Sequence, residues 1–260
     1  MFHHPSLVAL YALLLGGVVG SFLNVVIYRL PRGESLVRPR SRCPRCGVPI
    51  PFWANVPIFS YLLLRGRCRR CGDPIGLRYL LVEASTALLF FCLALRWGPS
   101  WHLLADWVVG AVLIAVAFID GEHRIIPNVL TLPLIPAAIL FALLPMHPTL
   151  AQSLAGLCVG GGMLWALSAF YEWRTARIGL GMGDVKLVAM LGAYLGLAPV
   201  LGVIVVGSLL GLGQGAWVIV ARGGGRKTAI PFGPALAAAG LLHLYAPTWL
   251  YDVTGRVLGV

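Results

Sequence analysis

The chain has 260 residues, of which 59% are hydrophobic and only 11% charged, and its formal net charge at pH 7 is +11. This composition excludes an ordinary soluble domain, because apolar stretches repeatedly approach or exceed the ~20 residues needed to cross a bilayer. The positive charge gives little reason to invoke nucleic acid, since membrane topology and attraction to anionic lipid account for it. We therefore predict an all-α polytopic membrane protein that contacts membrane lipid and binds no nucleic acid.

Eight transmembrane helices are expected from the apolar runs, in the order 7–27, 80–95, 101–119, 129–144, 150–171, 185–197, 199–220 and 234–250. The first is too long for a signal-peptide core and lacks a small-residue cleavage site after it, so we expect a retained anchor. The sixth and seventh are almost continuous, and their division is the least defined. Gly16 with Gly20, and Gly156 with Gly160, predict close helix packing.

The distribution of lysine and arginine predicts the orientation, because these residues accumulate in short cytoplasmic loops. All of them except Arg96 and Arg256 fall on one side of the predicted spans. Both termini should then lie outside the cytoplasm. The long loop 29–79 should face the cytoplasm, with Asp120 and Asp184 at the same boundary.

The loop 29–79 contains two cysteine pairs, and a glycine follows each pair. Two such knuckles can place four thiolates tetrahedrally around Zn²⁺, as in a zinc ribbon. Disulfides are the alternative, but they are rare in the reducing compartment that the orientation predicts. Four cysteines leave no open coordination position, so the expected zinc is structural, on the ligands Cys43, Cys46, Cys68 and Cys71.

Two aspartates stand at the ends of apolar runs, where a charged side chain is costly. Asp120 ends one run, and Asp184 follows Gly181 and Gly183 and opens another. Two carboxyl groups brought together can share one proton, so that one acts as base while the other stays acid. A water-activating aspartyl protease needs this arrangement.

Other patterns carry less weight. The glycines before Asp184, which include Gly179, imitate a nucleotide-binding loop but lack the strand that such a loop follows. Glu122 and His123 are adjacent and would point to different faces of a helix, which favours a loop or substrate contact over a metal site. Glu83 and Asp106 lie in or near spans and are candidate buried acids, although Asp106 can also reach the outer interface.

Taken together, motifs along nearly the whole chain resemble the type IV prepilin peptidases, membrane aspartyl proteases of the GxGD class. The resemblance is carried by the segments 20–31, 41–50, 55–57, 64–68, 78–79, 82–83, 119–127, 181–187 and 230–234. Pro127 closes the motif that begins at Asp120, and Lys186 follows Asp184 in the second motif. Asn128 stands where the family often has an acidic residue, and Gly121 where a side chain is common.

The resemblance implies a bifunctional enzyme of the bacterial inner membrane. It would cut the leader from prepilins of type IV pili, or from pseudopilins of type II secretion, on the cytoplasmic side with Asp120 and Asp184. It would also N-methylate the new N-terminus with S-adenosylmethionine, for which Gly66 and Arg67 are the nearest matched positions. The implied division is a first helix (1–28), a cytoplasmic four-cysteine zinc-binding loop with the methyltransferase region (29–79) and a membrane peptidase domain (80–260).

Two other classes compete with a peptidase. A proton-coupled transporter would also bury two aspartates, but it would usually show repeat-like halves, and no internal repeat is seen. A structural subunit of a secretion machine would not explain two aspartates at one boundary. A prepilin peptidase accounts for the aspartates and the cysteine pairs together.

Overall fold

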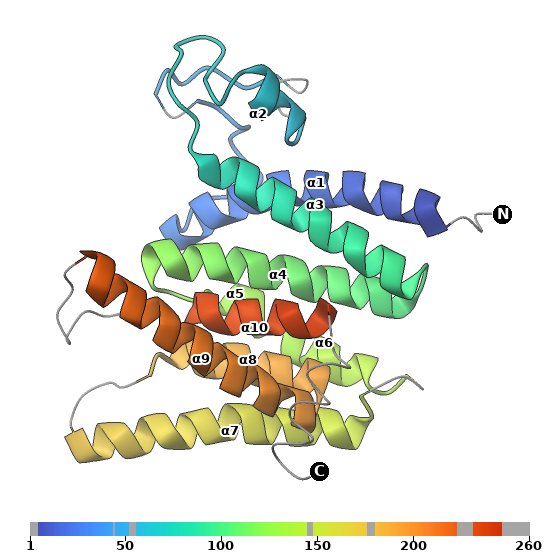
Figure 1. Cartoon of the computed structure of the whole chain (residues 1–260), viewed down its shortest axis with the longest axis vertical. Coiled ribbons are helices and arrows are strands. Elements are labelled where there is room, and N and C mark those ends of the chain that lie inside the picture. The colour runs from blue at the N-terminus through green and yellow to red at the C-terminus, as the bar shows by residue number, and fades with distance from the viewer. Residues whose placement is uncertain are drawn as a thin grey trace. The chain divides into compact units, whose positions relative to one another are not determined.

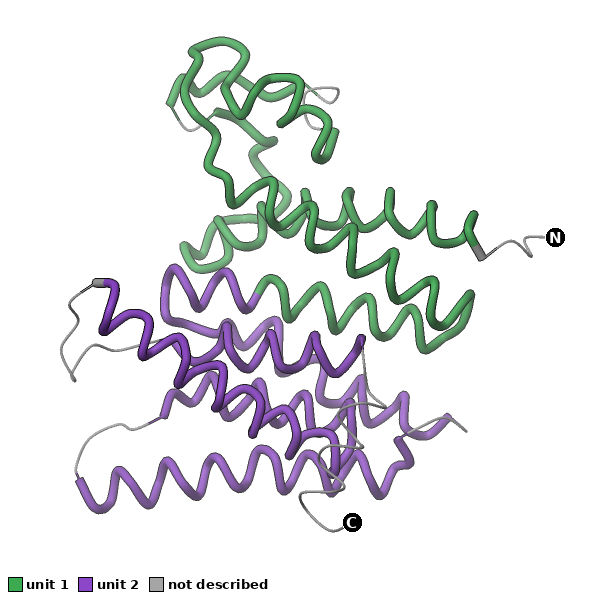
Figure 2. Tube along the Cα trace, in the orientation of Figure 1, with its two compact units in different colours: residues 1–115 green, residues 116–260 purple. Residues whose placement is uncertain are grey.

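The computed structural model describes residues 5–43, 45–51, 56–144, 148–175, 180–222 and 231–245. These residues form helices joined by loops, with two isolated β-bridges and no longer strand among them. Internal packing divides the chain into two units, residues 1–115 and 116–260 (Figure 2). The all-α architecture predicted from the composition is confirmed.

The first unit is built on two long helices that lie side by side (Figure 1). A Cβ atom on Gly16 or Gly20 would lie 2.7 Å from the Cα of Ala87 or Glu83, so glycine is required where these helices meet. The predicted close packing at Gly16 and Gly20 is therefore confirmed. The elements are α1 (Pro5–Arg29), the 3₁₀ turn η1 (Leu30–Arg32), α2 (Phe59–Leu63), α3 (Leu77–Trp97) and the first part of α4 (Trp101–His123).

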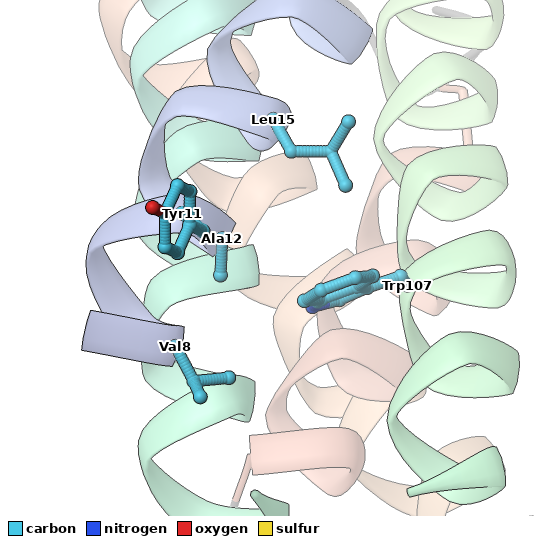
Figure 3. A pocket seen from close by; sticks show the side chains of 5 residues that line it. All are labelled: Val8, Tyr11, Ala12, Leu15 and Trp107. Carbon is cyan, nitrogen blue, oxygen red and sulfur yellow. The ribbon is translucent and has the colours of Figure 1, made fainter. Parts of the chain in front are cut away.

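An apolar groove of about 470 Å³ opens between α1 and the beginning of α4 (Figure 3). The Trp107 ring stacks on Phe90 with 4.8 Å between ring centroids, and its Nε1 donates to the Phe90 carbonyl oxygen at 3.2 Å. Lipid tails offer no acceptor for the indole N–H, so this hydrogen bond within the protein suits a ring that faces lipid. The groove is lined by Val8, Tyr11, Ala12, Leu15 and Trp107.

Among the described residues, the second unit contains the rest of α4 and six further helices. A Cβ on Gly156 of α7 would lie 2.2 Å from the Gly192 carbonyl oxygen of α8, and Ser153 donates to the Ala193 carbonyl oxygen at 2.6 Å. This backbone contact confirms the predicted close packing at Gly156. The helices are α5 (Asn128–Thr131), α6 (Leu134–Phe141), α7 (Leu150–Thr175), α8 (Met182–Leu195), α9 (Leu197–Arg222) and α10 (Gly233–Tyr245).

Helices lie at all eight predicted spans, and five are long and apolar enough to cross a membrane: Ser6–Arg32, Leu77–Trp97, Trp101–His123, Leu150–Thr175 and Leu197–Ala221. The other three differ from a simple span. The predicted span 129–144 is broken into α5 and α6 at Pro133, α8 has 14 residues, and α10 has 13 before residues 246–250, which lie outside the described ranges. Gly196, with a φ of 89°, separates α8 from α9. The chain is a multi-pass membrane protein.

Candidate functional site

The two cysteine pairs form two knuckles with the same hydrogen bonds. In the first knuckle, the Cys43 N–H donates to the Val48 carbonyl oxygen, and the Gly47 N–H donates to the Cys43 carbonyl oxygen. In the second, the Cys68 N–H donates to the Asp73 carbonyl oxygen, and the Gly72 N–H donates to the Cys68 carbonyl oxygen. Gly47 and Gly72 take φ values of 69° and 71°, a conformation that favours glycine. This confirms why a glycine follows each pair.

The geometry of the four sulfurs fits a tetrahedral metal. All four Sγ atoms lie within 4.8 Å of one another, and those of Cys43 and Cys71 are 3.8 Å apart. A tetrahedral Zn²⁺ with Zn–S bonds of about 2.3 Å requires sulfurs about 3.8 Å apart. Backbone N–H groups of Cys71 and Arg70 lower the pKa of the Cys68 thiol to about 6. The backbone N–H of Asp73 lowers the pKa of the Cys71 thiol, but burial and the neighbouring cysteines outweigh it and raise that pKa to about 12, so metal binding would release a proton from this pair. This cluster of Cys43, Cys46, Cys68 and Cys71 can hold a metal such as zinc.

Asp120 lies near the end of α4 and is only 6% exposed. Its Oδ2 accepts a hydrogen bond of 2.9 Å from the backbone N–H of Gly233, the first residue of α10. A Cβ on Gly233 would lie 2.6 Å from this oxygen, so a side chain there would displace the carboxylate. The beginning of α10 therefore fixes Asp120 by a backbone contact that needs glycine.

Asp184 lies in the first turn of α8 and is 9% exposed. The helix begins at Met182, three residues before the predicted start of the span, and this brings Asp184 into the helix. A Cβ on Gly181 would lie 3.2 Å from Asp184 Oδ2, and one on Gly183 would lie 2.9 Å from Ile126 Cβ. Gly181 thus leaves room for the carboxylate, and Gly183 leaves room for the segment that follows Asp120. Gly179 lies outside the described residues.

The two aspartates are brought into one site within the second unit. Gly183, next to Asp184, packs against Ile126, six residues after Asp120, and both carboxyl groups are almost fully buried. Like charges in a poorly solvated site cannot both ionise easily, so such a pair holds one proton between its members. The arrangement can therefore supply a base and an acid together.

The segments that carry the aspartates are also joined by a side-chain hydrogen bond. Lys186 Nζ donates to Asn128 Oδ1 at 2.9 Å, and Asn128 is the first residue of α5, directly after Pro127. The amide oxygen of Asn128 therefore accepts directly from a lysine two residues after Asp184. This hydrogen bond connects the two motifs.

Gly66 and Arg67, the candidate methyltransferase positions, lie beside the second knuckle. Gly66 has a φ of 65°, and a Cβ there would lie 2.9 Å from the Tyr61 ring. The Tyr61 hydroxyl donates to the Ile75 carbonyl oxygen at 3.2 Å. Glycine at position 66 therefore allows the Tyr61 ring to pack against the knuckle. Arg67, the next residue, forms a β-bridge with Pro74.

The remaining candidate acids lie in helices. Glu83 is buried in α3, and its Oε2 accepts the backbone N–H of Ile58 at 2.7 Å. Asp106 is 7% exposed in α4. Glu122 Oε2 lies 3.9 Å from His123 Nε2. Within the part of the chain that the structure describes, only the four cysteines form a cluster able to hold a metal.

Sequence reasoning assigned no function to Gly233, which lies 113 residues from Asp120. The signal was present, because residues 230–234 form a motif directly before a predicted span. A backbone donor, however, leaves no trace in side-chain chemistry, so the motif alone could not name its partner.

Comparison with known proteins gives one family over most of the chain. Residues 14–97 match the bacterial peptidase A24 N-terminal domain, and residues 107–216 match the type IV leader peptidase family. The chain is 40% identical to a prepilin leader peptidase/N-methyltransferase of Neisseria gonorrhoeae, covering 88% of this chain and 87% of that protein. It is 40% identical to the protein of that name from Aeromonas hydrophila (92% and 89% covered) and 38% identical to that from Pseudomonas aeruginosa (93% and 91%). No solved structure matches it. The chain belongs to the type IV leader peptidase family.

Proposed function

We propose that this protein cleaves the leader peptide of type IV prepilins or type II secretion pseudopilins, using Asp120 and Asp184, and N-methylates the new N-terminus. The observation that carries the cleavage is the pair of buried aspartates, whose two motifs pack together where Gly183 meets Ile126. The names of the relatives support both reactions.

In the proposed cleavage, one aspartate takes a proton from a water molecule as that water attacks the scissile carbonyl carbon. The other aspartate, protonated, donates a hydrogen bond to the carbonyl oxygen and later gives its proton to the leaving amine. The two carboxyl groups titrate as a unit, so the roles of base and acid are assigned to the pair and not to one aspartate each. Lys186, Pro127, Gly181 and Gly183 support the geometry of the two motifs.

The four-cysteine cluster would hold Zn²⁺ in a structural role, because four thiolates fill its coordination shell. We propose the surrounding segment, 29–79, as the methyltransferase region, with 1–28 as the first helix and 80–260 as the peptidase part. S-adenosylmethionine would supply the methyl group there. A cavity of about 1250 Å³ offers tyrosine rings and carboxylates, which suit an adenine ring and a sulfonium cation. Tyr61, beside Gly66, lines this cavity, as does Arg67.

The distribution of lysine and arginine supports an inner-membrane protein whose four-cysteine loop and aspartates face the cytoplasm. A prepilin already inserted through its apolar segment would present its cleavage site at that boundary. Lipid would surround the apolar helices.

The experiment is to incubate the purified protein with a prepilin and S-adenosylmethionine and to analyse the product by mass spectrometry. We expect a mature chain whose mass shows loss of the leader and gain of one methyl group. Omission of S-adenosylmethionine should leave cleavage and abolish the mass gain. An unchanged prepilin would refute the proposed cleavage, and a cleaved product that stays unmethylated would refute the second activity.

A further inference from the structure

The four-cysteine loop joins the end of α1 to the start of α3 (Figure 1). Polar residues from these two helix ends form the inner wall of the cavity in the first unit. Asn24 and Glu83 both line it, and they are 3% and 8% exposed. Along a helix that rises about 1.5 Å per residue, Asn24 lies about 8 Å before the end of α1 at Arg29. Glu83 lies about 9 Å after the start of α3 at Leu77. The inner wall therefore lies inside the helix pair, below the loop.

The orientation of the Asn24 amide is set by its neighbours. Its Nδ2 donates to the Tyr79 carbonyl oxygen at 3.1 Å and approaches the Gly20 carbonyl oxygen at 3.4 Å. Both neighbours are acceptors, so the NH₂ group must face them and Oδ1 must face away. Oδ1 is buried and has no hydrogen-bond partner. A buried acceptor left unpaired is costly, and it indicates a missing donor.

Glu83 adds a carboxylate on the same wall. It accepts the N–H of Ile58 at 2.7 Å and a hydrogen bond from the Ser21 side chain. A carboxylate offers about four lone-pair positions, so Glu83 can accept further donors. The residues lining this part of the cavity thus include an amide whose buried oxygen lacks a donor and a carboxylate with lone pairs left over. A ligand with several N–H groups and a positive charge satisfies both.

We propose that Asn24 and Glu83 form a recognition site for an α-ammonium group. This inference rests on the proposed function, which has two molecules with that group: the processed pilin, whose new N-terminus ends an apolar segment, and S-adenosylmethionine. The site lies within the helix pair, which favours the pilin amine over that of S-adenosylmethionine. The pilin amine is carried at the end of an apolar segment, which can pack against apolar helices. Asn24 and Glu83 then position the amine for methylation.

The test measures binding of a peptide that copies the mature N-terminus of a prepilin, with a free or an acetylated amine, to the full-length protein in nanodiscs. The parent protein should prefer the free amine by about tenfold or more, as expected for hydrogen bonds to a charged group. Asn24→Leu and Glu83→Gln should each reduce this preference to near unity. Metal content and helicity of each variant show that the fold is intact, and the conservative Glu83→Gln variant keeps the test valid if Asn24→Leu does not fold.

Thr86→Val is the matched control. Thr86 is fully buried between the same helices and donates to the Val82 carbonyl oxygen at 2.7 Å, and it is not among the described residues that line the cavity. Its variant should keep the preference for the free amine. Loss of the preference in Thr86→Val as well would show a packing effect and overturn the inference.

A second arm separates the two sources of the ammonium group. S-adenosylhomocysteine is compared with its analogue that lacks the α-amine, on the same variants. If the variants lose the preference for the free over the acetylated peptide, the site belongs to the pilin. If they lose the preference for S-adenosylhomocysteine over its analogue without the α-amine, the site belongs to the methyl donor. No change in either arm refutes the site, whereas a parent protein that neither cleaves nor methylates a prepilin refutes the proposed function instead.

Discussion

Replacing Gly233 with alanine tests how Asp120 is held. The new Cβ would lie 2.6 Å from Asp120 Oδ2, 2.9 Å from its Cγ and 3.0 Å from its Cβ, distances that real Cβ atoms rarely or never show. Either the carboxylate or the start of α10 must move, and the 2.9 Å hydrogen bond from the Gly233 N–H is lost. A hydrogen bond to a charged group contributes about 1.5–3 kcal/mol, and misplacement of a catalytic group by about 1 Å costs about 10²-fold in rate.

We therefore expect Gly233→Ala to lower kcat for prepilin cleavage by about 10²-fold while the protein stays folded. Mass spectrometry of product formed over time gives the rate, and thermal unfolding in detergent gives the stability. Gly162→Ala is the matched control, because a Cβ there meets nothing within 4 Å. A Gly233→Ala variant that cleaves at the rate of Gly162→Ala would refute a role for this contact in positioning Asp120.

Three further predictions follow from the same geometry. Asp120→Asn and Asp184→Asn should each lower cleavage by about 10³-fold or more, because neither amide exchanges a proton, and turnover near the parent rate would refute the two-aspartate mechanism. Cys68→Ser should remove bound zinc, as metal analysis would measure, and expose the 29–79 segment to protease; full metal occupancy would argue against a site of four cysteines. Gly192→Ala should lower stability by about 3 kcal/mol, because its Cβ would lie 2.1 Å from the Gly156 carbonyl oxygen. An unchanged unfolding temperature would contradict that packing.

The sequence predicted the positions of the helices well, because lipid permits few ways of satisfying the backbone and long apolar runs follow directly from that restriction. It did not predict the break at Pro133, although proline is a known cause of helix interruption, because the run 129–144 is apolar throughout. Nor did it place Asp184 inside α8. Glycine lowers helix propensity, so Gly181 and Gly183 suggested a loop, whereas the structure starts the helix between them at Met182.

The sequence predicted those parts of the candidate site that consist of chemically distinctive side chains. The four cysteines and the two aspartates each carry a chemical signature, and the structure brings each set together. Gly233 and Asn24 carry no such signature. Their contributions, a backbone donor and an unpaired amide oxygen, arise from contacts between segments distant in sequence, which no local pattern encodes.

The four-cysteine segment has almost no hydrophobic core of its own. Among its described residues between 30 and 76, only Cys43 and Gly66 are buried. Under the proposed function, zinc would replace a core, and the stability of the segment would follow the concentration of free metal by mass action. Each tenfold fall in free zinc would lower that stability by about 1.4 kcal/mol while the segment stays largely loaded. The aspartate site, built from residues after 115, contains none of the metal ligands. On the proposed assignment of methylation to this segment, zinc starvation would impair methylation before cleavage, and pili assembled under such conditions would carry unmethylated N-termini.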